Sequence, residues 1–349
     1  ALTQQPCLVG VFDEPEPGRM AHIDWARWAD LVVVAPATAD AINKLAAGIG
    51  DDMLTTLCLA TEAPWVLAPA MNPAMYSHPA TVDALSTLSA RAAWIVEPTE
   101  GDVACGEHGQ GKLASIAAIV EAIGTLTKRS TRLHGKKVLV TSGPTREPID
   151  DVRFVSNRSS GKMGAALAQA ALLMGAEVTV VTGPVSTPLP ARARVIRVET
   201  AIEMLEGARG PAKDSDLIIG AAAVADYRPI DPTPGKSRRG EGTVTLALTQ
   251  NPDIIAALAK ENPRAVAIAF AAEPGEGIDY ARLKLHSKGV RAIAINDVSR
   301  EDIGFESDFN ELVWLTENQE VRSGRLPKLA CALWLLERAT GELSALNAH

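Results

Sequence analysis

The sequence predicts an α/β protein with two Rossmann-like, three-layer domains whose sheets are mostly parallel. Apolar runs of strand length recur along the chain, and stretches with helical spacing separate them. A polar and basic segment, LTKRSTRLHGKK at 126–137, divides two such series. We therefore place the first domain at residues 1–128 and the second at 129–349, a division that a chain of 349 residues allows.

The first domain contains three apolar runs that we interpret as strands: LVVVAP at 31–36, WVLAPA at 65–70 and AWIVEP at 93–98. Nearly continuous hydrophobicity is typical of parallel strands covered on both faces, and ligands bind at the edge formed by the loops that follow such strands. A sheet usually has about 5 or 6 strands. Because fewer are evident and the chain starts with Ala, we expect a further segment with a first strand upstream of residue 1.

The second domain shows the same alternation from residue 137 onward. The expected strands are KVLVTS, EVTVVTG, RVIRV, DLIIGAAA, TVTLAL, AVAIAF, RAIAIN and ELVWL. The expected helices lie at about 161–174, 251–261, 278–288 and 326–342.

Composition and charge exclude several classes of protein. With 47% hydrophobic and 22% charged residues, the chain has the composition of an ordinary globular protein. Its net charge of -8 and pI near 5.4 argue against a nucleic-acid surface. Four cysteines without a CxxC spacing favour a reducing cytoplasm and exclude the usual zinc patterns. The apolar runs are shorter than the ~18 residues of a membrane span, so we expect a cytoplasmic protein without nucleic-acid or membrane partners.

The stretch TSGPTREPIDDVRFVSNRSSGKMG at 141–164 is expected to form a strand end, a long polar loop and a helix start. The phosphate loop GxxxxGK[ST] is excluded, because Ser156 replaces its first glycine and Met163 its hydroxyl. The dinucleotide fingerprint GxGxxG also lacks its first glycine. What remains is a helix N-terminus, which favours an anion, preceded by Arg153 and Asn157. An ordinary capped loop is the alternative.

Three residues of the first domain are candidates for chemistry. His22, just ahead of a helix, could act as a base, although a lone histidine there is more often structural. Asn72 follows a strand at the expected ligand edge, where its amide could hold a carboxylate or simply stabilise a turn. Cys105 lies in a glycine-rich flap, EGDVACGEHGQGK, where a thiol could donate a proton, whereas most cysteines are buried and inert.

The second domain brings cationic groups to one edge of its sheet. Asp226 follows a strand of small residues, AAAVADYRP, and Lys236 begins the basic cluster KSRR, which could also be a solvated turn. Lys284 and Lys288 are one helical turn apart on one face. Such an arrangement neutralises the charge that phosphoryl or nucleotidyl transfer spreads over phosphate oxygens.

Together these stretches resemble the bifunctional phosphopantothenoylcysteine decarboxylase/phosphopantothenate–cysteine ligase family of coenzyme A biosynthesis. The resemblance covers nearly the whole chain and rests on ordered motifs: HI…WAD…APATA, PAMN, ACGEHGQGK, TSGPTREPIDDVRFVSNRSSGKMG, AAAVADYRP, KSRR, NPDII, FAAE and NDVS. It implies a flavoprotein-like decarboxylase domain, partial in this chain, followed by a ligase domain.

For the ligase, the resemblance implies that CTP, with Mg²⁺, activates the carboxylate of 4'-phosphopantothenate as an acyl-cytidylate and releases diphosphate. Cysteine then forms the amide and releases CMP. Arg153, Asn157 and Lys236 match the family's residues for the intermediate and its formation. The positions that match CTP contacts are Gly220, Ala221, Ala222, Asp226, Lys236, Pro252, Asp253, Ile254, Ile255, Phe270, Lys284 and Lys288. The metal ligands are not implied.

Two motifs depart from the family pattern. KSRR replaces KxKK, so two lysines become arginines, which keep the charge but change the hydrogen-bond geometry. FAAEP replaces FAAET, so Pro274 removes a hydroxyl and a backbone donor. We expect both changes to be tolerated.

For the decarboxylase, the resemblance implies FMN, which oxidises the thiol of 4'-phosphopantothenoylcysteine so that carbon dioxide can leave, giving 4'-phosphopantetheine. His22 matches the active-site histidine, Asn72 the residue that holds the substrate carboxylate, and Cys105 the acid that protonates the enethiolate. The family's flavin-phosphate loop is expected upstream of residue 1, so we expect this chain by itself to bind FMN much more weakly.

Two alternatives stay open at this stage. The chain could work as a ligase alone, or its first domain could be a non-catalytic oligomerisation module. The resemblance also implies a homo-oligomer, with decarboxylase trimers and ligase dimers.

Overall fold

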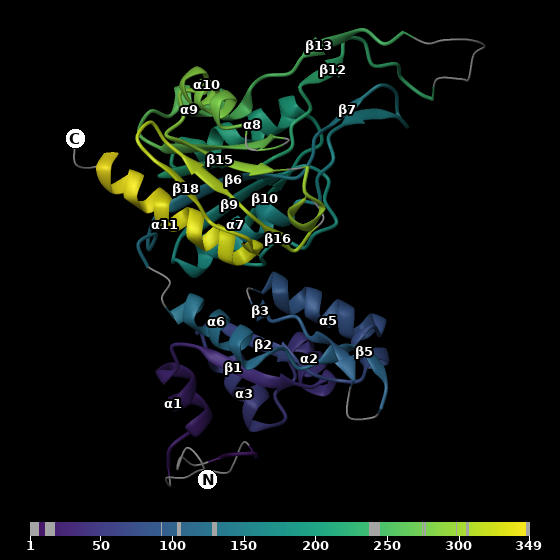
Figure 1. The fold of residues 1–349 in the computed structure, drawn as a ribbon, viewed down its shortest axis with the longest axis vertical. Coiled ribbons are helices and arrows are strands. Elements are labelled where there is room, and N and C mark those ends of the chain that lie inside the picture. Colours follow the sequence, from purple (N-terminus) through teal and green to yellow (C-terminus); the bar gives the residue numbers. More distant parts are fainter. Residues whose placement is uncertain are drawn as a thin grey trace. The chain divides into compact units, whose positions relative to one another are not determined.

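The computed structural model describes residues 7–10, 18–91, 93–102, 106–127, 131–236, 245–273, 275, 277–297, 299–304 and 307–346. It divides into two compact units, Ala1–Arg129 and Ser130–His349. Both are mixed α/β (Figure 1).

The first unit is built on a parallel sheet, which in its described residues has the order β1 (Val32–Ala37), β2 (Trp65–Pro69) and β3 (Trp94–Ile95). β2 and β3 fall within their predicted apolar runs, and β1 extends one residue beyond its run of 31–36. Leu67 of β2 is fully buried, as are Ile42 and Leu88 of the helices that pack around it. These apolar contacts make the core of the unit.

The helices of the first unit begin where the sequence supplies a cap. The Thr38 side chain accepts a hydrogen bond from Ala41 N, and Asp52 forms a reciprocal capping box with Thr55. The helices are α1 (Ala21–Trp28), α2 (Ala39–Ala47), α3 (Met53–Ala60), α4 (Pro73–Tyr76), α5 (Pro79–Ala90) and α6 (Ile116–Thr127).

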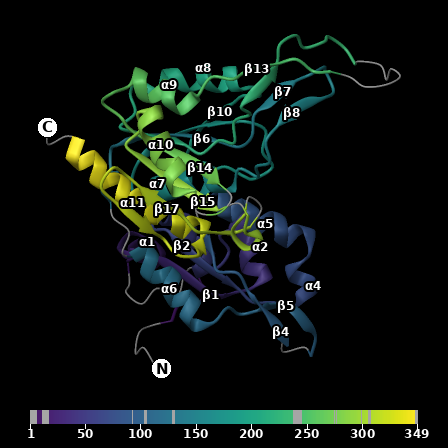
Figure 2. The same cartoon turned by 45° about the horizontal axis from the view of Figure 1, so that its top comes forward.

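The predicted glycine-rich flap contains a hairpin of β4 (Thr99–Asp102) and β5 (His108–Lys112), which lies beside α4 in Figure 2. The backbone of β5 meets the loop after β2, because Met71 N donates to Gly111 O at 2.9 Å. A Cβ atom at Gly111 would lie 2.3 Å from Met71 O. Only glycine therefore fits at this approach.

The second unit has, among its described residues, an eight-stranded sheet of order β10-β9-β6-β11-β14-β15-β17-β18. The first six strands are parallel and the last two antiparallel. The bounds are β6 (Lys137–Ser142), β9 (Glu177–Thr182), β10 (Arg194–Arg197), β11 (Leu217–Gly220), β14 (Val266–Glu273), β15 (Ala292–Asp297), β17 (Val313–Leu315) and β18 (Glu320–Arg322). After β6 the chain adds β9 and then β10 on one side of β6. It then returns to the other side of β6 with β11. The topological switch point therefore lies between these two strands.

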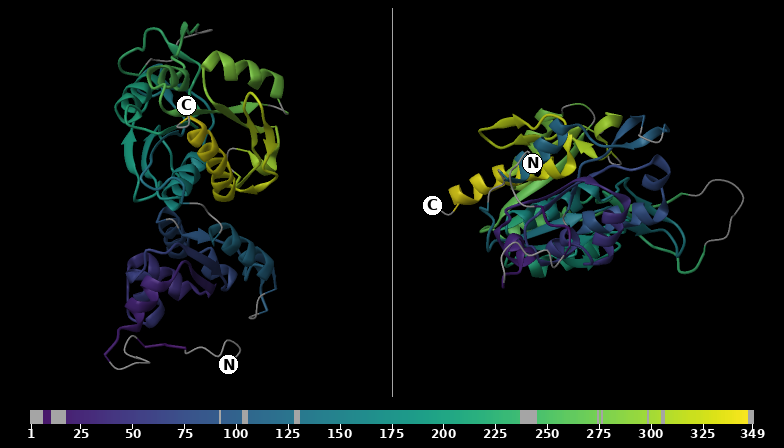
Figure 3. Two further views of the ribbon diagram at one scale, coloured as in Figure 1. Left: turned by 90° about the vertical axis from the view of Figure 1, so that its left-hand side faces the viewer. Right: turned by 90° about the horizontal axis from the view of Figure 1, so that it is seen from below.

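Helices cover both faces of this sheet (Figures 1 and 3). One face carries α7 (Lys162–Leu173) and α11 (Lys328–Leu346), which pack on each other. The other carries α8 (Ala201–Ala212), α9 (Ile254–Glu261) and α10 (Ile278–Lys288). A short 3-10 helix, η1, spans Glu301–Ile303. This arrangement confirms the predicted three-layer fold class, although α8 was not among the expected helices.

Short strand pairs stand apart from the sheet: β7 (Arg146–Pro148) with β8 (Phe154–Ser156), β12 (Tyr227–Pro229) with β13 (Leu248–Gln250), and β16 (Phe309–Asn310) with β19 (Leu326–Pro327). The prediction of a strand at 243–248 was wrong in its bounds. Residues 243 and 244 lie outside the described residues, and the strand found starts at Leu248 and pairs with β12. We call β7, β8, β12, β13 and the described loop residues 149–153, 230–236 and 245–247 the arm, which projects from the unit in Figure 1.

The described residues include no helix that is both long enough and apolar enough to cross a membrane.

Candidate functional site

A cavity of the second unit lies at the switch point, with a volume of about 570 Å³. Thr141, Gly220 and Ala269 stand in register on β6, β11 and β14, and all three line it. Carboxyl ends of parallel strands at a switch point are the usual place for a ligand in such sheets.

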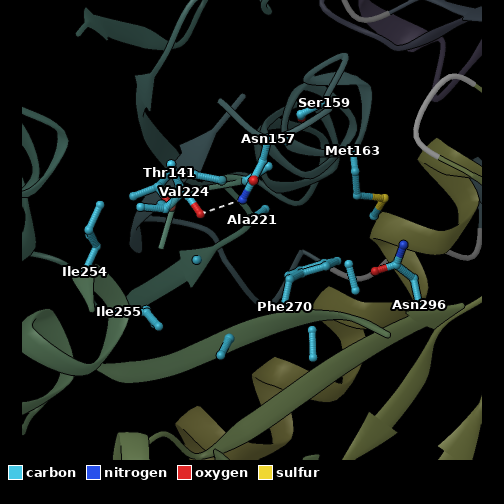
Figure 4. A pocket seen from close by; sticks show the side chains of 18 of the residues that line it. Thr141, Asn157, Ser159, Met163, Ala221, Val224, Ile254, Ile255, Phe270 and Asn296 are labelled. Atoms are coloured by element: carbon cyan, nitrogen blue, oxygen red, sulfur yellow. Dashed lines mark hydrogen bonds between the residues drawn. The ribbon is translucent and has the colours of Figure 1, made fainter. Parts of the chain in front are cut away.

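Most residues predicted to contact the nucleotide line this cavity. They are Gly220, Ala221, Ala222, Asp226, Pro252, Asp253, Ile254, Ile255, Phe270, Lys284 and Lys288. Asn157, which was predicted to handle the intermediate, also lines it. Figure 4 shows Ile254 and Ile255 on one side of the cavity, Phe270 in the middle, and Met163 and Asn296 on the other side. Asn157 and Lys288, which are 131 positions apart in sequence (288 − 157), thus share one cavity.

Asn157 and the start of α7 form the wall opposite the strand ends. The Asn157 amide donates from Nδ2 to Val224 O at 2.8 Å, which ties the polar loop to the segment after β11 (Figure 4). α7 starts after Gly161, whose φ of 77° suits glycine and which has no side chain to act as a cap, while Ser160 Oγ accepts from Lys162 N at 3.4 Å. Unpaired N–H groups at a helix start favour an anion. The prediction of a helix start at SSGKMG is confirmed.

The two lysines predicted on one helical face both line the cavity, and each has a carboxylate partner. Lys284 Nζ lies 2.6 Å from Glu273 Oε1, and its ammonium also packs over the Tyr280 ring. Lys288 pairs with Asp253, whose other oxygen caps α9 by accepting from Ala256 N. A bound anion would have to share these cations with their carboxylates.

Arg153 and Lys236 do not line the cavity; both lie on the arm. Arg153 NH1 lies 3.4 Å from the buried Asp150 carboxylate, and Lys236 is exposed. The two segments are hydrogen-bonded to each other, since Gly235 N donates to Asp151 Oδ2 and Asp151 N to Gly235 O. The structure therefore brings these two residues near each other and leaves them outside the cavity.

Sequence reasoning missed the cavity end next to α7 and α11. Its lining includes Lys162, Asn296, Gly304, Asn310 and Lys328. Asn296 belongs to the quoted NDVS stretch, which had no role assigned to it. Nothing local marks Asn310 or Lys328, because their position depends on the packing of α11 against α7.

In the first unit, two of the three candidate residues, His22 and Asn72, lie within the described residues. His22 lies in α1, and its buried Nδ1 has no hydrogen-bond partner among the described residues. Asn72 caps α4 by accepting from Ala74 N, and its Nδ2 donates to Glu107 Oε2 at 2.8 Å. Cys105 lies outside the described residues. The flap that carries it is nonetheless joined to Asn72 through Glu107, two positions further on.

The described residues contain no group of three or more His, Cys, Asp or Glu side chains arranged to hold a metal ion.

Comparison with known proteins gives a match for each unit. Residues 133–341 match the family model described as DNA/pantothenate metabolism flavoprotein C-terminal domain, and residues 4–128 match the model described as flavoprotein. The Coenzyme A biosynthesis bifunctional protein CoaBC of Bacillus subtilis is 43% identical over 313 residues, which cover 89% of this chain and 77% of the relative. That of Escherichia coli K12 is 40% identical over 316 residues, covering 89% and 78%.

Solved structures match the second unit. The C-terminal domain of a Coenzyme A biosynthesis bifunctional protein CoaBC is 34% identical, with a TM-score of 0.52, and is covered completely by 62% of this chain. The DNA/pantothenate metabolism flavoprotein from Streptococcus pneumoniae is 25% identical, with a TM-score of 0.52, and is covered completely by 60% of this chain. From these matches, the chain belongs to the family of bifunctional coenzyme A biosynthesis proteins.

Proposed function

We propose that this enzyme of coenzyme A biosynthesis, which has a ligase and a decarboxylase activity, uses CTP in the first and FMN in the second. The ligase joins 4'-phosphopantothenate to cysteine, and the decarboxylase converts the resulting 4'-phosphopantothenoylcysteine to 4'-phosphopantetheine. The observation that carries the CTP proposal is the cavity at the switch point, which gathers nearly all the residues that match CTP contacts.

The ligase reaction proceeds in two displacements. A carboxylate oxygen of phosphopantothenate attacks the α-phosphorus of CTP, and the bond to the β-phosphate oxygen breaks to release diphosphate. The cysteine amine then attacks the acyl carbon, loses a proton to solvent, and displaces CMP. In both steps negative charge develops on phosphate oxygens. Hydrogen-bond donors and cations that are already held in place stabilise such charge most effectively.

The cavity supplies such donors on two sides. The first turn of α7 points N–H groups at a phosphate, and Lys284 and Lys288 offer cations already held by carboxylates. The small side chains after β11, at Gly220, Ala221 and Ala222, let a flat base approach the backbone. We assign Asn157 to the acyl-cytidylate intermediate. Its side-chain amide joins the polar loop to Val224 O, and this hydrogen bond holds it at the cavity.

Arg153 and Lys236 complete the proposed ligase site from the arm. Since neither lines the cavity, their roles require the arm to approach a cavity, either of its own chain or of a second copy. Phe154 and Tyr227 of the arm are 47% and 53% exposed, which supports a contact with a second copy. We therefore include a homo-oligomer in the proposal.

Mg²⁺ enters the proposal with CTP. The triphosphate oxygens would supply most of its ligands, as is usual for nucleotide-bound Mg²⁺, and Asp226 is a carboxylate in the lining that could add one. We place these reactions in the cytoplasm, where both nucleotide and reduced cysteine are available.

The residues of the first unit fit a flavin-dependent decarboxylase. His22 has a buried ring nitrogen without a partner among the described residues, which is suited to a bound molecule. The Asn72 amide already donates to one carboxylate, that of Glu107, and could exchange it for the substrate carboxylate. FMN would supply the two-electron redox chemistry. Cys105, which lies outside the described residues, would then protonate the enethiolate.

The match of the flavoprotein family model to residues 4–128 favours a bifunctional enzyme over a chain that works as a ligase alone.

The experiment that tests this proposal incubates the purified chain with phosphopantothenate, cysteine, Mg²⁺ and CTP. We expect one CMP and one diphosphate for each amide formed, and no CMP without phosphopantothenate. Product formation with ATP at the same rate as with CTP would contradict the nucleotide assignment, and absence of CMP would contradict the ligase mechanism.

A further inference from the structure

One end of the switch-point cavity has a set of donors to which the proposed reaction gives no role. It lies against α7 and α11, and its lining includes Lys162, Asn310 and Lys328. The residues that match CTP contacts line other parts of the same cavity.

Lys328 is a buried cation whose partners are carbonyl groups. It is 7% exposed, and its ammonium donates to Gly304 O at 3.2 Å, to Phe309 O at 3.3 Å and to Ser307 O. Among the described residues, no carboxylate lies within ion-pairing distance of it. Carbonyl dipoles solvate an ammonium without cancelling its charge, so a net positive charge stays at this end.

The segment 307–310, which Lys328 holds, also positions the other donors. Asp308 accepts from Lys162 Nζ at 2.7 Å, which joins this segment to the first turn of α7. Asn310 is 3% exposed; its Oδ1 accepts from Glu311 N, and among the described residues its Nδ2 has the Met163 sulfur, at 3.6 Å, as its hydrogen-bond partner. A thioether is a weak acceptor, so this hydrogen bond offsets little of the free energy that the buried amide donor loses by leaving water.

This arrangement has an electrostatic cost, which lowers the pKa of Lys328. Burial lowers its pKa to about 8, with the charge of Lys162 as the second cause. Asp308 and the Cys331 thiol act in the opposite direction. A bound anion would favour the charged ammonium and so relieve part of this cost.

We propose that Lys328 is a positioning residue for the diphosphate that leaves CTP: it holds segment 307–310 so that the Asn310 amide and the charge at this end face the departing phosphate oxygens. This inference rests on the proposed use of CTP. The single phosphate of phosphopantothenate has the same chemistry. Diphosphate is favoured because it carries more negative charge than a single phosphate and gains more from the uncompensated charge of Lys328.

Lys328→Met tests the charge, with Lys213→Met as control, because Lys213 is an exposed lysine at the end of α8. With CMP release as the assay, we expect Lys328→Met to raise the inhibition constant of inorganic diphosphate and the KM for CTP at least tenfold. The KM for phosphopantothenate should stay within about twofold, because that substrate has no contact with this end. Lys213→Met should leave all three constants unchanged.

A second variant tests the same inference if Lys328→Met does not fold. Asn310→Asp keeps the acceptor for Glu311 N but replaces the amide donor with a negative charge. It should weaken inhibition by diphosphate at least tenfold.

Lys328→Arg separates a positioning role from a general loss of structure. In the wild type, inhibition by diphosphate should weaken as pH rises through 8, because the ammonium loses its proton there. A guanidinium stays charged, so the arginine variant should retain inhibition above pH 8 where the wild type loses it. Lys162, Asp308 and Cys331 face the same site and are common to both proteins.

The outcomes distinguish this inference from the proposed function. If the wild type releases no CMP, both fall. If it releases CMP but diphosphate inhibits the wild type, Lys328→Met and Asn310→Asp equally, the inference alone is wrong. A rise in the KM for phosphopantothenate with unchanged inhibition by diphosphate would also overturn it, in favour of the other phosphate.

Discussion

Gly164, in the first turn of α7, allows this helix to lie directly on β6. A Cβ atom at this position would be 2.1 Å from Ser142 Oγ and 2.5 Å from Ser142 Cβ. Ser142 is fully buried at the end of β6, a strand that is paired on both sides with β9 and β11. In Gly164→Ala the strand cannot yield, so α7 has to move away by about 1 Å to restore ordinary contact distances.

The cost follows from that displacement. Overpacking in a rigid core costs about 1–3 kcal/mol, and the better helix propensity of Ala returns up to about 1 kcal/mol. We therefore expect Gly164→Ala to lose about 0–3 kcal/mol of stability by these two terms. The effect on activity should be larger, because the same turn carries Gly161 and Lys162 of the cavity lining. A displacement of 1 Å can cost on the order of 10²-fold in rate.

Two further variants make the test specific. In Gly164→Ala combined with Ser142→Gly, the nearest atom of residue 142 would be Cα at 3.3 Å, so most of the loss should be recovered. Gly341→Ala in α11 has no atom within 4 Å of the new Cβ and should stabilise by about 0.4–1 kcal/mol. Urea midpoints of the full chain and CMP release measure both effects. A Gly164→Ala variant as stable and active as Gly341→Ala would refute the packing of α7 on β6.

Three other substitutions test the proposed roles. Asn157→Asp loses the donor to Val224 O and places a charge beside phosphate oxygens, so it should bind CTP normally but form little amide, whereas full turnover would remove Asn157 from the mechanism. Lys236→Gln should slow CMP release by on the order of 10²-fold, as the loss of one electrostatic donor does, with unchanged circular dichroism; an unchanged rate would contradict its role. Cys105→Ser, in a chain that releases carbon dioxide, should still do so but accumulate the unreduced enethiol, which mass spectrometry detects. Complete conversion to 4'-phosphopantetheine would show that another group donates the proton.

The sequence predicted best those elements that carry their own hydrophobic signal. Continuous apolar runs located β2, β6, β14 and β15 to within a few residues, because strands covered on both faces need apolar residues at every position. α8 was missed even though Thr200 and Glu203 form a capping box, a local signal that was available. β13 was misplaced because it belongs to the arm and has no core to impose a register.

The site was predictable only where its residues belong to recognisable stretches. Asn157 and Phe270 sit in quoted motifs and line the cavity. Lys328 could not be found in this way, since its site depends on an ion pair between Lys162 and Asp308, which are 146 positions apart. The placement of Arg153 and Lys236 on the arm was equally hidden, because the pairing of Asp151 with Gly235 is a tertiary contact.

The central claim is that the ligase forms an acyl-cytidylate, and the fate of one oxygen atom tests it directly. With phosphopantothenate labelled with ¹⁸O in its carboxylate, the attacking oxygen stays on the α-phosphorus when the cysteine amine displaces CMP. The CMP isolated after complete reaction should therefore carry one ¹⁸O atom for each amide formed, and the diphosphate none. Label in the diphosphate, or unlabelled CMP, would show that activation follows a different route.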